Sequence, residues 1–315
     1  MGKIAFVFPG QGSQTVGMAQ KMAECDLDAK LIIEKADRRL ESPLSRTMFS
    51  GPQEELTQTA NAQPALLTSG IAILQGLRKA GIEPDYTAGH SLGEYTALVA
   101  AGAIPFEDAV YAVRKRGEYM EAAVPNGAGT MAAVLGLGRE ELQAITTEIT
   151  QSGHPVQLAN LNCPGQIVIS GTKEGVEQAG AKAKEAGAKR VLPLQVSGPF
   201  HSSLMKPAAE RFAHILGSID IRQAKVPVIA NVTAQPVTSP SEIKELLIEQ
   251  LYSPVLWEDT VRELLALGVD TFIEIGPGKV LSGLIKKVDR NANIFAVQDP
   301  DSLEAALAEL KGEEA

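Results

Sequence analysis

The chain has little cysteine and no long apolar run. Its 315 residues include two cysteines, Cys25 and Cys163, which are too few for a disulfide framework and too far apart for a C-x-x-C metal or redox motif. The apolar start "KIAFVF" stops at Pro9, which is typical of a strand rather than a signal peptide. No apolar stretch approaches the length of a membrane span. We therefore expect a protein of the reducing cytoplasm that does not enter a membrane.

Positive charge is also scarce. The formal net charge is −9, which disfavours broad attraction to nucleic acid or to anionic membranes. Any anionic partner must therefore bind at local basic spots. We expect no metal and no cofactor.

Short β-branched or aromatic runs alternate with helical segments over most of the chain. "KIAFVF" precedes "GQGSQTVGMAQKMAE", "YTAGH" precedes "SLGEYTALVAAG", and "TFIEIG" precedes "PGKVLSGLIKKV". This alternation predicts an α/β fold with a mostly parallel sheet that helices cover on both faces.

The stretch from 126 to 195 has a different order. Its runs predict strand, helix, strand, strand, helix and strand, which is the βαββαβ unit of a ferredoxin-like domain. We interpret it as an insertion, so that the main domain is discontinuous and spans 1–125 and 196–315. A chain of this length can hold a large domain that carries a smaller one.

A G-x-S-x-G pentapeptide, Gly89 to Gly93, lies between a predicted strand and a predicted helix. In such a turn the glycines permit a sharp bend that exposes the serine above the sheet. Ser91 is thus a candidate nucleophile, and the amide of Leu92, at the helix start, is a candidate donor to an oxyanion. The alternative is an ordinary strand-to-helix turn that happens to contain glycine and serine.

A second oxyanion donor is expected from the loop "FPGQGSQ", which follows the first predicted strand and is predicted to open a helix. We place Gln11, between two glycines, beside Ser91. The glycines also suggest a dinucleotide site, but their spacing is G-x-G-x-x-x-x-G, and no acidic residue closes a second strand about twenty positions on. The dinucleotide hypothesis is therefore disfavoured.

Four histidines compete for the role of base. His90 adjoins Ser91 and is expected to point away from it. His154 lies in a loop of the insertion, and His214 on the solvated side of a predicted helix. His201, in "SGPFHSS", enters the main domain just before a helix and is the best candidate. No acid stands out between the serine and His201, so we expect a dyad whose histidine is oriented by a neutral group.

An arginine is predicted to turn toward the interior. In "PFEDAVYAVRKRGEYM", Arg116 falls on the edge of the inward apolar stripe, whereas Arg114 and Lys115 face outward. An inward guanidinium needs a carboxylate, since an unpaired buried charge is costly. Either an internal acid supplies it or the substrate does, through a two-pronged contact.

Together these residues resemble a known family. The motifs are "FPGQGSQ", "NAQPALL", "AGHSLGEYTALVAAG", "VRKRGEYM", "NCPGQIVISG", "GPFHSSLMKPAAE" and "EIGPGKVLSGL". In this order, over nearly the whole chain, they are similar to those of the malonyl-CoA:acyl-carrier-protein transacylases of fatty-acid synthesis. The resemblance implies an α/β-hydrolase-like core, an inserted ferredoxin-like subdomain and an active site in the cleft between them.

The resemblance also implies roles for single residues. Ser91 matches the nucleophile and His201 its base. Gln11 and Leu92 match the residues whose amides form the oxyanion hole. Gln250, in "EQLYSPV", matches the residue whose backbone carbonyl orients the histidine, which fits the missing acid.

Three further residues match substrate-binding positions. Arg116 matches the residue that pairs with the free malonyl carboxylate. Phe200, beside His201, resembles the phenylalanine associated with malonyl preference over methylmalonyl in related polyketide acyltransferases. Gln63, in "NAQPALL", matches a motif near the site, without an assigned step.

The implied reaction is ping-pong transfer of malonyl from malonyl-CoA, through a malonyl-serine ester, to the phosphopantetheine thiol of acyl carrier protein. Carrier proteins are acidic, so docking requires basic islands. The candidates are Lys189-Arg190, at the end of the insertion, and Lys286-Lys287, in the last long helix. For either pair taken alone, an ordinary solvated face is the favoured interpretation. We expect a monomer.

Other functions compete with this one. The same chemistry could serve a polyketide pathway, and sequence motifs scarcely separate the two. A serine hydrolase shares the turn but predicts rapid loss of the acyl group to water and dependence on an acidic residue. A carrier-binding module without activity would leave the serine, histidine and arginine unexplained together.

Overall fold

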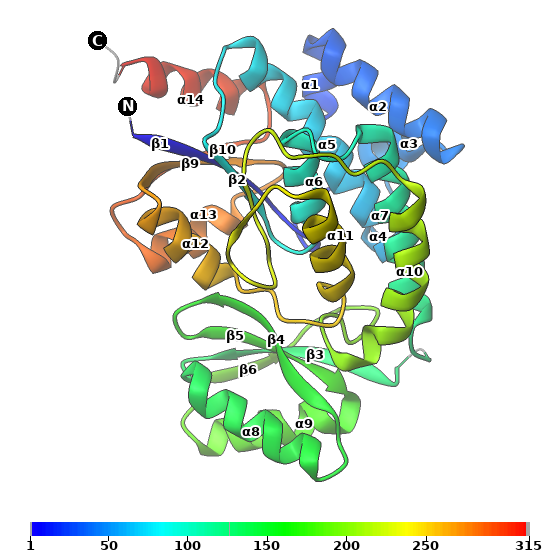
Figure 1. Ribbon diagram of the computed structural model, residues 1–315, viewed down its shortest axis with the longest axis vertical. Helices are drawn as coiled ribbons and strands as arrows, with labels where there is room; N and C mark the ends of the chain where they lie inside the picture. Colours follow the sequence, from blue (N-terminus) through cyan, green and yellow to red (C-terminus); the bar gives the residue numbers. More distant parts are fainter. Residues whose placement is uncertain (1, 126, 313–315) are drawn as a thin grey trace.

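The computed structural model describes residues 2–125 and 127–312, which form two β-sheets with helices around them (Figure 1). The predicted insertion boundary at 126 and the chain end at 313–315 lie outside the described residues. The first sheet has six strands in the order β10-β9-β1-β2-β7-β8, and every neighbouring pair except β7 with β8 is parallel. Its strands are β1 (Lys3–Phe8), β2 (Tyr86–Gly89), β7 (Val228–Ile229), β8 (Pro236–Val237), β9 (Val269–Ile275) and β10 (Asn293–Val297). The predicted mostly parallel sheet is confirmed.

Helices cover both faces of this sheet, as the alternation of side chains along β1 requires. Phe6 and Phe8 belong to the core formed with α5 (Thr59–Lys79), α6 (Leu92–Ala100) and α7 (Phe106–Ala122). Ala5 and Val7 point the other way, into a second core with α12 (Trp257–Ala266) and α13 (Val280–Val288). Figure 1 shows these two groups of helices on opposite sides of the sheet.

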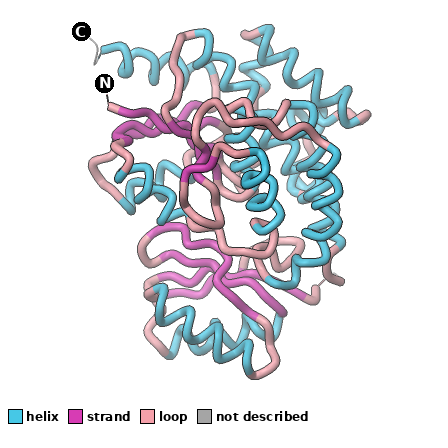
Figure 2. Tube along the Cα trace, viewed as in Figure 1, coloured by secondary structure: helices cyan, strands magenta, loops and turns pink. Residues whose placement is uncertain are grey.

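The second sheet is antiparallel, in the order β4-β5-β3-β6. Its chain order is β3 (Gly129–Leu135), α8 (Arg139–Gln151), β4 (Val156–Cys163), β5 (Gln166–Thr172), α9 (Lys173–Glu185) and β6 (Arg190–Pro193). The predicted succession of elements is therefore confirmed. Figure 2 shows the four strands as a separate layer, with α8 and α9 on the side away from the first sheet.

The remaining helices surround the first sheet or close the chain. None of the helices in the described part of the chain is both long and apolar enough to cross a membrane. These helices are α1 (Gln20–Cys25), α2 (Leu27–Leu40), α3 (Leu44–Ser50), α4 (Gln53–Thr57), α10 (Lys206–Ser218), α11 (Pro240–Glu249) and α14 (Pro300–Gly312), with a 3₁₀ turn at Ser203–Met205.

Two sequence-based expectations need correction. The loop after β1 does not open a helix, because α1 begins only at Gln20. Gly12, Gly17 and Ala19 have φ values of 105°, 94° and 59°, which a right-handed helix does not allow. Lys286-Lys287 lies in α13 rather than in the last long helix, since α14 follows it.

Candidate active site

A cavity of about 260 Å³ lies between the two sheets. The loops that follow β1 and β2 line one side, at the carboxyl edge of the parallel sheet, where α/β folds place their ligands. The antiparallel sheet supplies the opposite side, and α13 contributes Leu284. The sequence-predicted residues Gln11, Ser91, Leu92, Arg116, Phe200 and His201 all line this cavity.

Ser91 occupies a strained turn between β2 and α6. Its φ and ψ are 53° and −106°, and it is the N-terminal capping residue of the helix that begins at Leu92. A Cβ atom on Gly89 would lie 1.9 Å from the carbonyl carbon of Gly93, so the turn closes only with glycine there. A non-glycine residue in this region costs about 1–3 kcal/mol, which the surrounding structure must offset.

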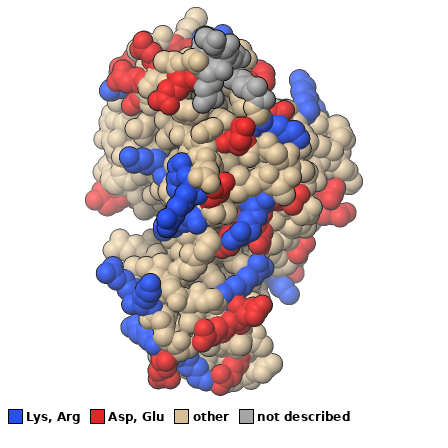
Figure 3. Space-filling view, turned by 90° about the vertical axis from the view of Figure 1, so that its left-hand side faces the viewer, with Lys and Arg blue, Asp and Glu red and all other residues tan. Residues whose placement is uncertain are grey.

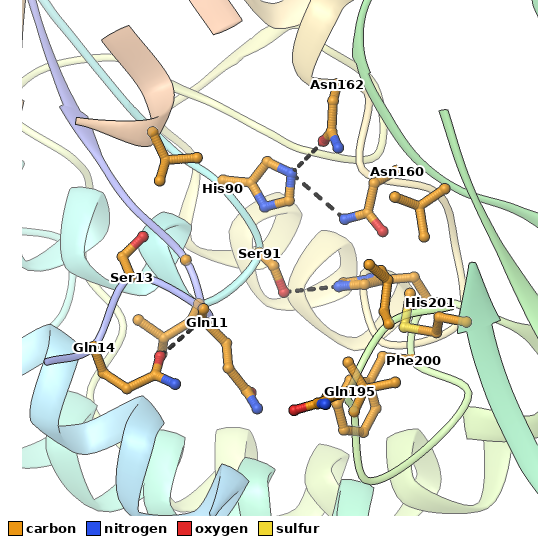
Figure 4. Close-up of a pocket in the computed structure, with 18 of the residues that line it drawn as sticks. Gln11, Ser13, Gln14, His90, Ser91, Asn160, Asn162, Gln195, Phe200 and His201 are labelled. Atoms are coloured by element: carbon orange, nitrogen blue, oxygen red, sulfur yellow. Dashed lines mark hydrogen bonds between the residues drawn. The ribbon is translucent and has the colours of Figure 1, made fainter. Parts of the chain in front are cut away.

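Ser91 and His201 are hydrogen-bonded, with 2.7 Å between Oγ and Nε2 (Figure 4). On its other side, the Nδ1–H of His201 donates to the backbone carbonyl of Gln250 at 2.8 Å, which leaves Nε2 as the acceptor. The histidine is thus oriented by a neutral group. Burial, together with the charge of Arg116, lowers the pKa of His201 to about 3. The imidazole is neutral at physiological pH and can take a proton from Ser91.

Among the described residues, none of the other three histidines is hydrogen-bonded to Ser91 Oγ. His90 Nε2 contacts Asn162 Oδ1 at 2.9 Å and Asn160 Nδ2 at 3.4 Å, and its ring points away from the serine (Figure 4). His154 is in the loop before β4, and His214 is exposed on α10.

Arg116 turns toward the interior, as predicted, and is buried, with 1% of its surface exposed. Its Nη2 donates to Ser91 Oγ at 3.1 Å and to Gln250 Oε1 at 2.8 Å. Its Nη1 donates to Gln63 Oε1 at 2.9 Å, which gives Gln63 a place in the site. Nε makes no hydrogen bond within the described residues. The cation is therefore held directly by uncharged groups.

An internal acid lies one hydrogen bond further away. Gln250 Nε2 donates to Glu94 Oε2 at 2.7 Å, and Glu94 is 2% exposed. Burial raises the pKa of Glu94 to about 7, against the hydrogen bonds of Gln250 and Asn231 and the charge of Arg116. Sequence reasoning missed this residue. The signal was that Glu94 is the single charged residue of the helix "LGEYTALVA".

Asn231 was also missed. It follows β7, the neighbour of β2, and its Oδ1 accepts from the Ser91 amide at 2.7 Å. Its Nδ2 donates to the Gly89 carbonyl, also at 2.7 Å. The available signal was a polar residue directly after a buried strand, at the edge of the sheet where ligands bind.

The loop with Gln11 packs directly on the serine turn. A Cβ atom on Gly10 would lie 2.4 Å from the His90 carbonyl oxygen, so glycine permits this approach. The Gln11 side chain donates to Thr59 Oγ1 at 3.0 Å. Within the described residues, the backbone amides of Gln11 and Leu92 donate no hydrogen bond, so both are available to a ligand.

The two basic pairs are exposed, one at the start of β6 and one on α13. Lys287 Nζ donates to Gln166 Oε1 at 3.0 Å, and Gln166 lines the cavity. In the antiparallel sheet Leu135 pairs with Gln166 on one side and with Arg190 on the other, so these strand ends are close neighbours. Figure 3, which faces this side of the molecule, shows Lys and Arg side chains above and below a hollow.

Among the described residues no group of three or more His, Cys, Asp or Glu side chains is arranged to hold a metal ion.

The acyl transferase domain model matches residues 5–301. This chain belongs to the acyl transferase family. It is 60% identical over 313 residues to the malonyl CoA-acyl carrier protein transacylase of Bacillus subtilis (strain 168), covering 99% of each chain.

Solved structures of the family superpose closely. An acyl carrier protein S-malonyltransferase from Vibrio cholerae is 46% identical, with a TM-score of 0.94 over 96% of this chain and 99% of that one. A malonyl-transacylase in complex with a type II polyketide acyl carrier protein is 43% identical, with a TM-score of 0.94 over 98% and 99% of the two chains.

Proposed function

We propose that this chain transfers the malonyl group of malonyl-CoA to the phosphopantetheine thiol of an acyl carrier protein in fatty-acid synthesis, through a malonyl ester of Ser91. The names of its full-length relatives support this function. The observation that carries it is the hydrogen bond from Arg116 Nη2 to Ser91 Oγ. A fixed cation beside the nucleophile suits an acyl group that has a carboxylate of its own.

In the first half-reaction, His201 Nε2 takes the Ser91 proton as Oγ attacks the thioester carbonyl. The amides of Gln11 and Leu92 donate to the oxyanion, and the positive end of α6 favours the charge there. Collapse of the tetrahedral intermediate breaks the C–S bond. CoA leaves as the thiol after taking the proton from His201.

In the second half-reaction, the carrier's thiol enters the same cavity. His201 removes the thiol proton as sulfur attacks the ester carbonyl, and the same two amides hold the oxyanion. The C–O bond then breaks and His201 returns the proton to Ser91. The product is malonyl-carrier protein and free enzyme.

Substrate choice is assigned to Arg116, with Gln63 and Gln250 holding its guanidinium in place. An acetyl group would leave the buried charge without a partner, so dicarboxylic acyl groups are preferred. Phe200 lies beside His201 and lines the cavity. Its bulk would oppose a methyl branch at the α-carbon and so favour malonyl over methylmalonyl.

The fold supports a finer description. We infer an α/β-hydrolase-like core from 1–125 and 196–315 and an inserted ferredoxin-like subdomain from 126–195. The order β4-β5-β3-β6 with two helices on one face supports the ferredoxin-like interpretation. The strand-turn-helix around Ser91 supports the hydrolase-like one.

The carrier protein is proposed to dock on the basic rim formed by Lys189, Arg190, Lys286 and Lys287. Such a rim would steer an acidic partner toward the cavity despite the net charge of −9. The proposed chemistry uses no cofactor and no metal. We further propose a cytoplasmic monomer without affinity for nucleic acid or membranes.

Intact mass spectrometry after mixing with malonyl-CoA, then with holo carrier protein, tests the function. We expect a malonyl adduct on wild type, none on Ser91→Ala, and loss of the adduct to the carrier. Rapid loss to water before carrier is added would indicate a hydrolase. Comparing fatty-acid and polyketide carriers separates the two pathways, and a faster rate with the polyketide carrier would contradict the fatty-acid assignment.

A further inference from the structure

Two buried side chains to which the proposed chemistry assigns no step, Glu94 and Asn231, meet next to the serine turn. Their exposed fractions are 2% and 0%. The backbone N–H of Asn231 donates to Glu94 Oε2 at 3.2 Å. Each of them makes its shorter contacts with a different part of the site, although Asn231 Oδ1 also accepts from Gln250 Nε2 at 3.4 Å.

Asn231 holds the backbone of the serine turn. The ladder between β2 and β7 ends at Ala88 and Ile229. Beyond it, the Asn231 side chain continues the pairing, because it accepts from the Ser91 amide and donates to the Gly89 carbonyl, both at 2.7 Å. These bonds offset the strain of the positive φ at Ser91 and set the direction of the next amide, which is the proposed oxyanion donor.

Glu94 holds the side-chain amide of Gln250. Oε2 accepts from Gln250 Nε2 at 2.7 Å, and the same Nε2 donates to the Ser91 carbonyl at 3.0 Å. With its nitrogen fixed in this way, the Gln250 amide must present Oε1 to Arg116 Nη2 at 2.8 Å. If the Gln250 amide were turned by about 180°, its NH₂ group would face the guanidinium, which is itself a donor, and the hydrogen bond to Arg116 would be lost.

We propose that Glu94 and Asn231 are positioning residues of the transferase, with Glu94 orienting Arg116 through Gln250 and Asn231 orienting the backbone of Ser91. Both bonds to Glu94 run to one oxygen, so its role is to accept hydrogen bonds, and an amide oxygen in the same place suffices. This inference rests on the roles proposed above for Ser91 and Arg116.

Three variants test the proposal: Glu94→Met, which removes the acceptor, Glu94→Gln, its matched control that keeps an acceptor, and Asn231→Asp. The measurement is the rate of acylation of Ser91 by malonyl-CoA and by acetyl-CoA, from quenched mixtures analysed by intact mass.

Glu94→Met should lower the malonyl rate about 10²-fold and the acetyl rate much less, because only malonyl needs the oriented Arg116. Glu94→Gln should keep both rates within about threefold of wild type. Asn231→Asp keeps the acceptor for the Ser91 amide. It replaces the Nδ2 donor with a carboxylate oxygen, which repels the Gly89 carbonyl oxygen. It should lower both rates by a similar factor of about 10 or more, with their ratio unchanged.

A Glu94→Gln enzyme as slow as Glu94→Met, an unchanged ratio in Glu94→Met, or a changed ratio in Asn231→Asp would each overturn the proposal. If Glu94→Met does not fold, Glu94→Ala takes its place with the same expectation, since the space left can hold water for the freed donors. Failure of the proposed function is distinguishable, because it would appear in wild type as the lack of a malonyl ester on Ser91.

Discussion

Arg116 donates directly to the oxygen of Ser91, with 3.1 Å between Nη2 and Oγ. The same guanidinium is 1% exposed and bonded only to uncharged groups within the described residues. Because its hydrogen-bond partners are uncharged, this buried cation can still pair with an anion that binds beside the nucleophile. The carboxylate of a bound malonyl group would supply it.

The first prediction concerns acyl choice. Arg116→Ala should lower the rate of serine acylation by malonyl-CoA relative to acetyl-CoA by about 10²-fold, since truncating one partner of a buried charge pair is costly. Arg114→Ala, on the same helix but bonded to Asn61, is the matched control and should leave the ratio unchanged. An unchanged ratio in Arg116→Ala would return the arginine to a structural role.

The second prediction concerns the base. Burial and the charge of Arg116 lower the pKa of His201 to about 3, so the imidazole stays neutral as pH falls through its usual range. The kcat/KM for malonyl-CoA should therefore show no loss with a pKa near 6.5. The profile is best measured between pH 5.5 and 8 in Glu94→Gln, which removes the titration of Glu94. A fall of about fivefold between pH 6.5 and pH 5.5, as a single group with a pKa near 6.5 would produce, would contradict it.

The third prediction concerns carrier docking. Reversing Lys286 and Lys287 to glutamate should raise the KM for carrier protein and leave serine acylation by malonyl-CoA unchanged. Rim charges act on encounter with an acidic partner, so the effect should shrink at high salt. Lys30→Glu with Lys35→Glu on α2 changes the net charge equally away from the rim and serves as the control.

Lys189→Glu with Arg190→Glu should behave as the other rim pair does. Equal effects on the two half-reactions, or an equal effect of the α2 control, would show that these cations do not form a carrier site.

The fourth prediction concerns stability. Burial raises the pKa of Glu94 from 4.5 to about 7, so between these values the folded protein binds a proton that the unfolded chain has lost. This contribution to stability is complete below pH 4.5 and is lost as pH rises through 7. Between pH 4 and pH 8, the free energy of unfolding of Glu94→Gln minus that of wild type should therefore increase by up to about 3 kcal/mol.

The measurement is urea unfolding of both proteins at several pH values. The difference between them isolates Glu94, because His201 and all other groups titrate in both. A difference that stays constant with pH would show that Glu94 ionises as it does in water.

Several parts of the site were predictable because their signals are local. The bend at Gly89 to Gly93 needs small residues in sequence, so the pentapeptide placed Ser91 between strand and helix. The same holds for the succession of strands and helices along the inserted unit, where the hydrophobic periodicity and the turn residues agree. His201 was predictable as the base because each of the other three histidines was expected to point away from the serine, to lie in a loop of the insertion or to face solvent.

The contacts that complete the site come from residues far apart in the chain. Glu94, Gln250 and Asn231 converge because α6, the end of α11 and the end of β7 meet at one edge of the sheet. Hydrophobic periodicity placed Arg116 at the edge of the apolar stripe of its helix, because periodicity cannot show that polar hydrogen-bond partners lie inside the fold. The loop of Gln11 does not open a helix as predicted, because the backbone takes positive φ at Gly12 and Gly17 before α1 begins at Gln20.

The sequence alone determined which chemical groups are present and which local turns can hold them: a serine between glycines, a histidine without a neighbouring acid, and an inward arginine. Only the tertiary structure decided the hydrogen-bond partners of those groups. Local conformation follows from the sterics of neighbouring residues, whereas the protonation and orientation of Glu94, Arg116 and His201 depend on burial and on contacts across the whole fold.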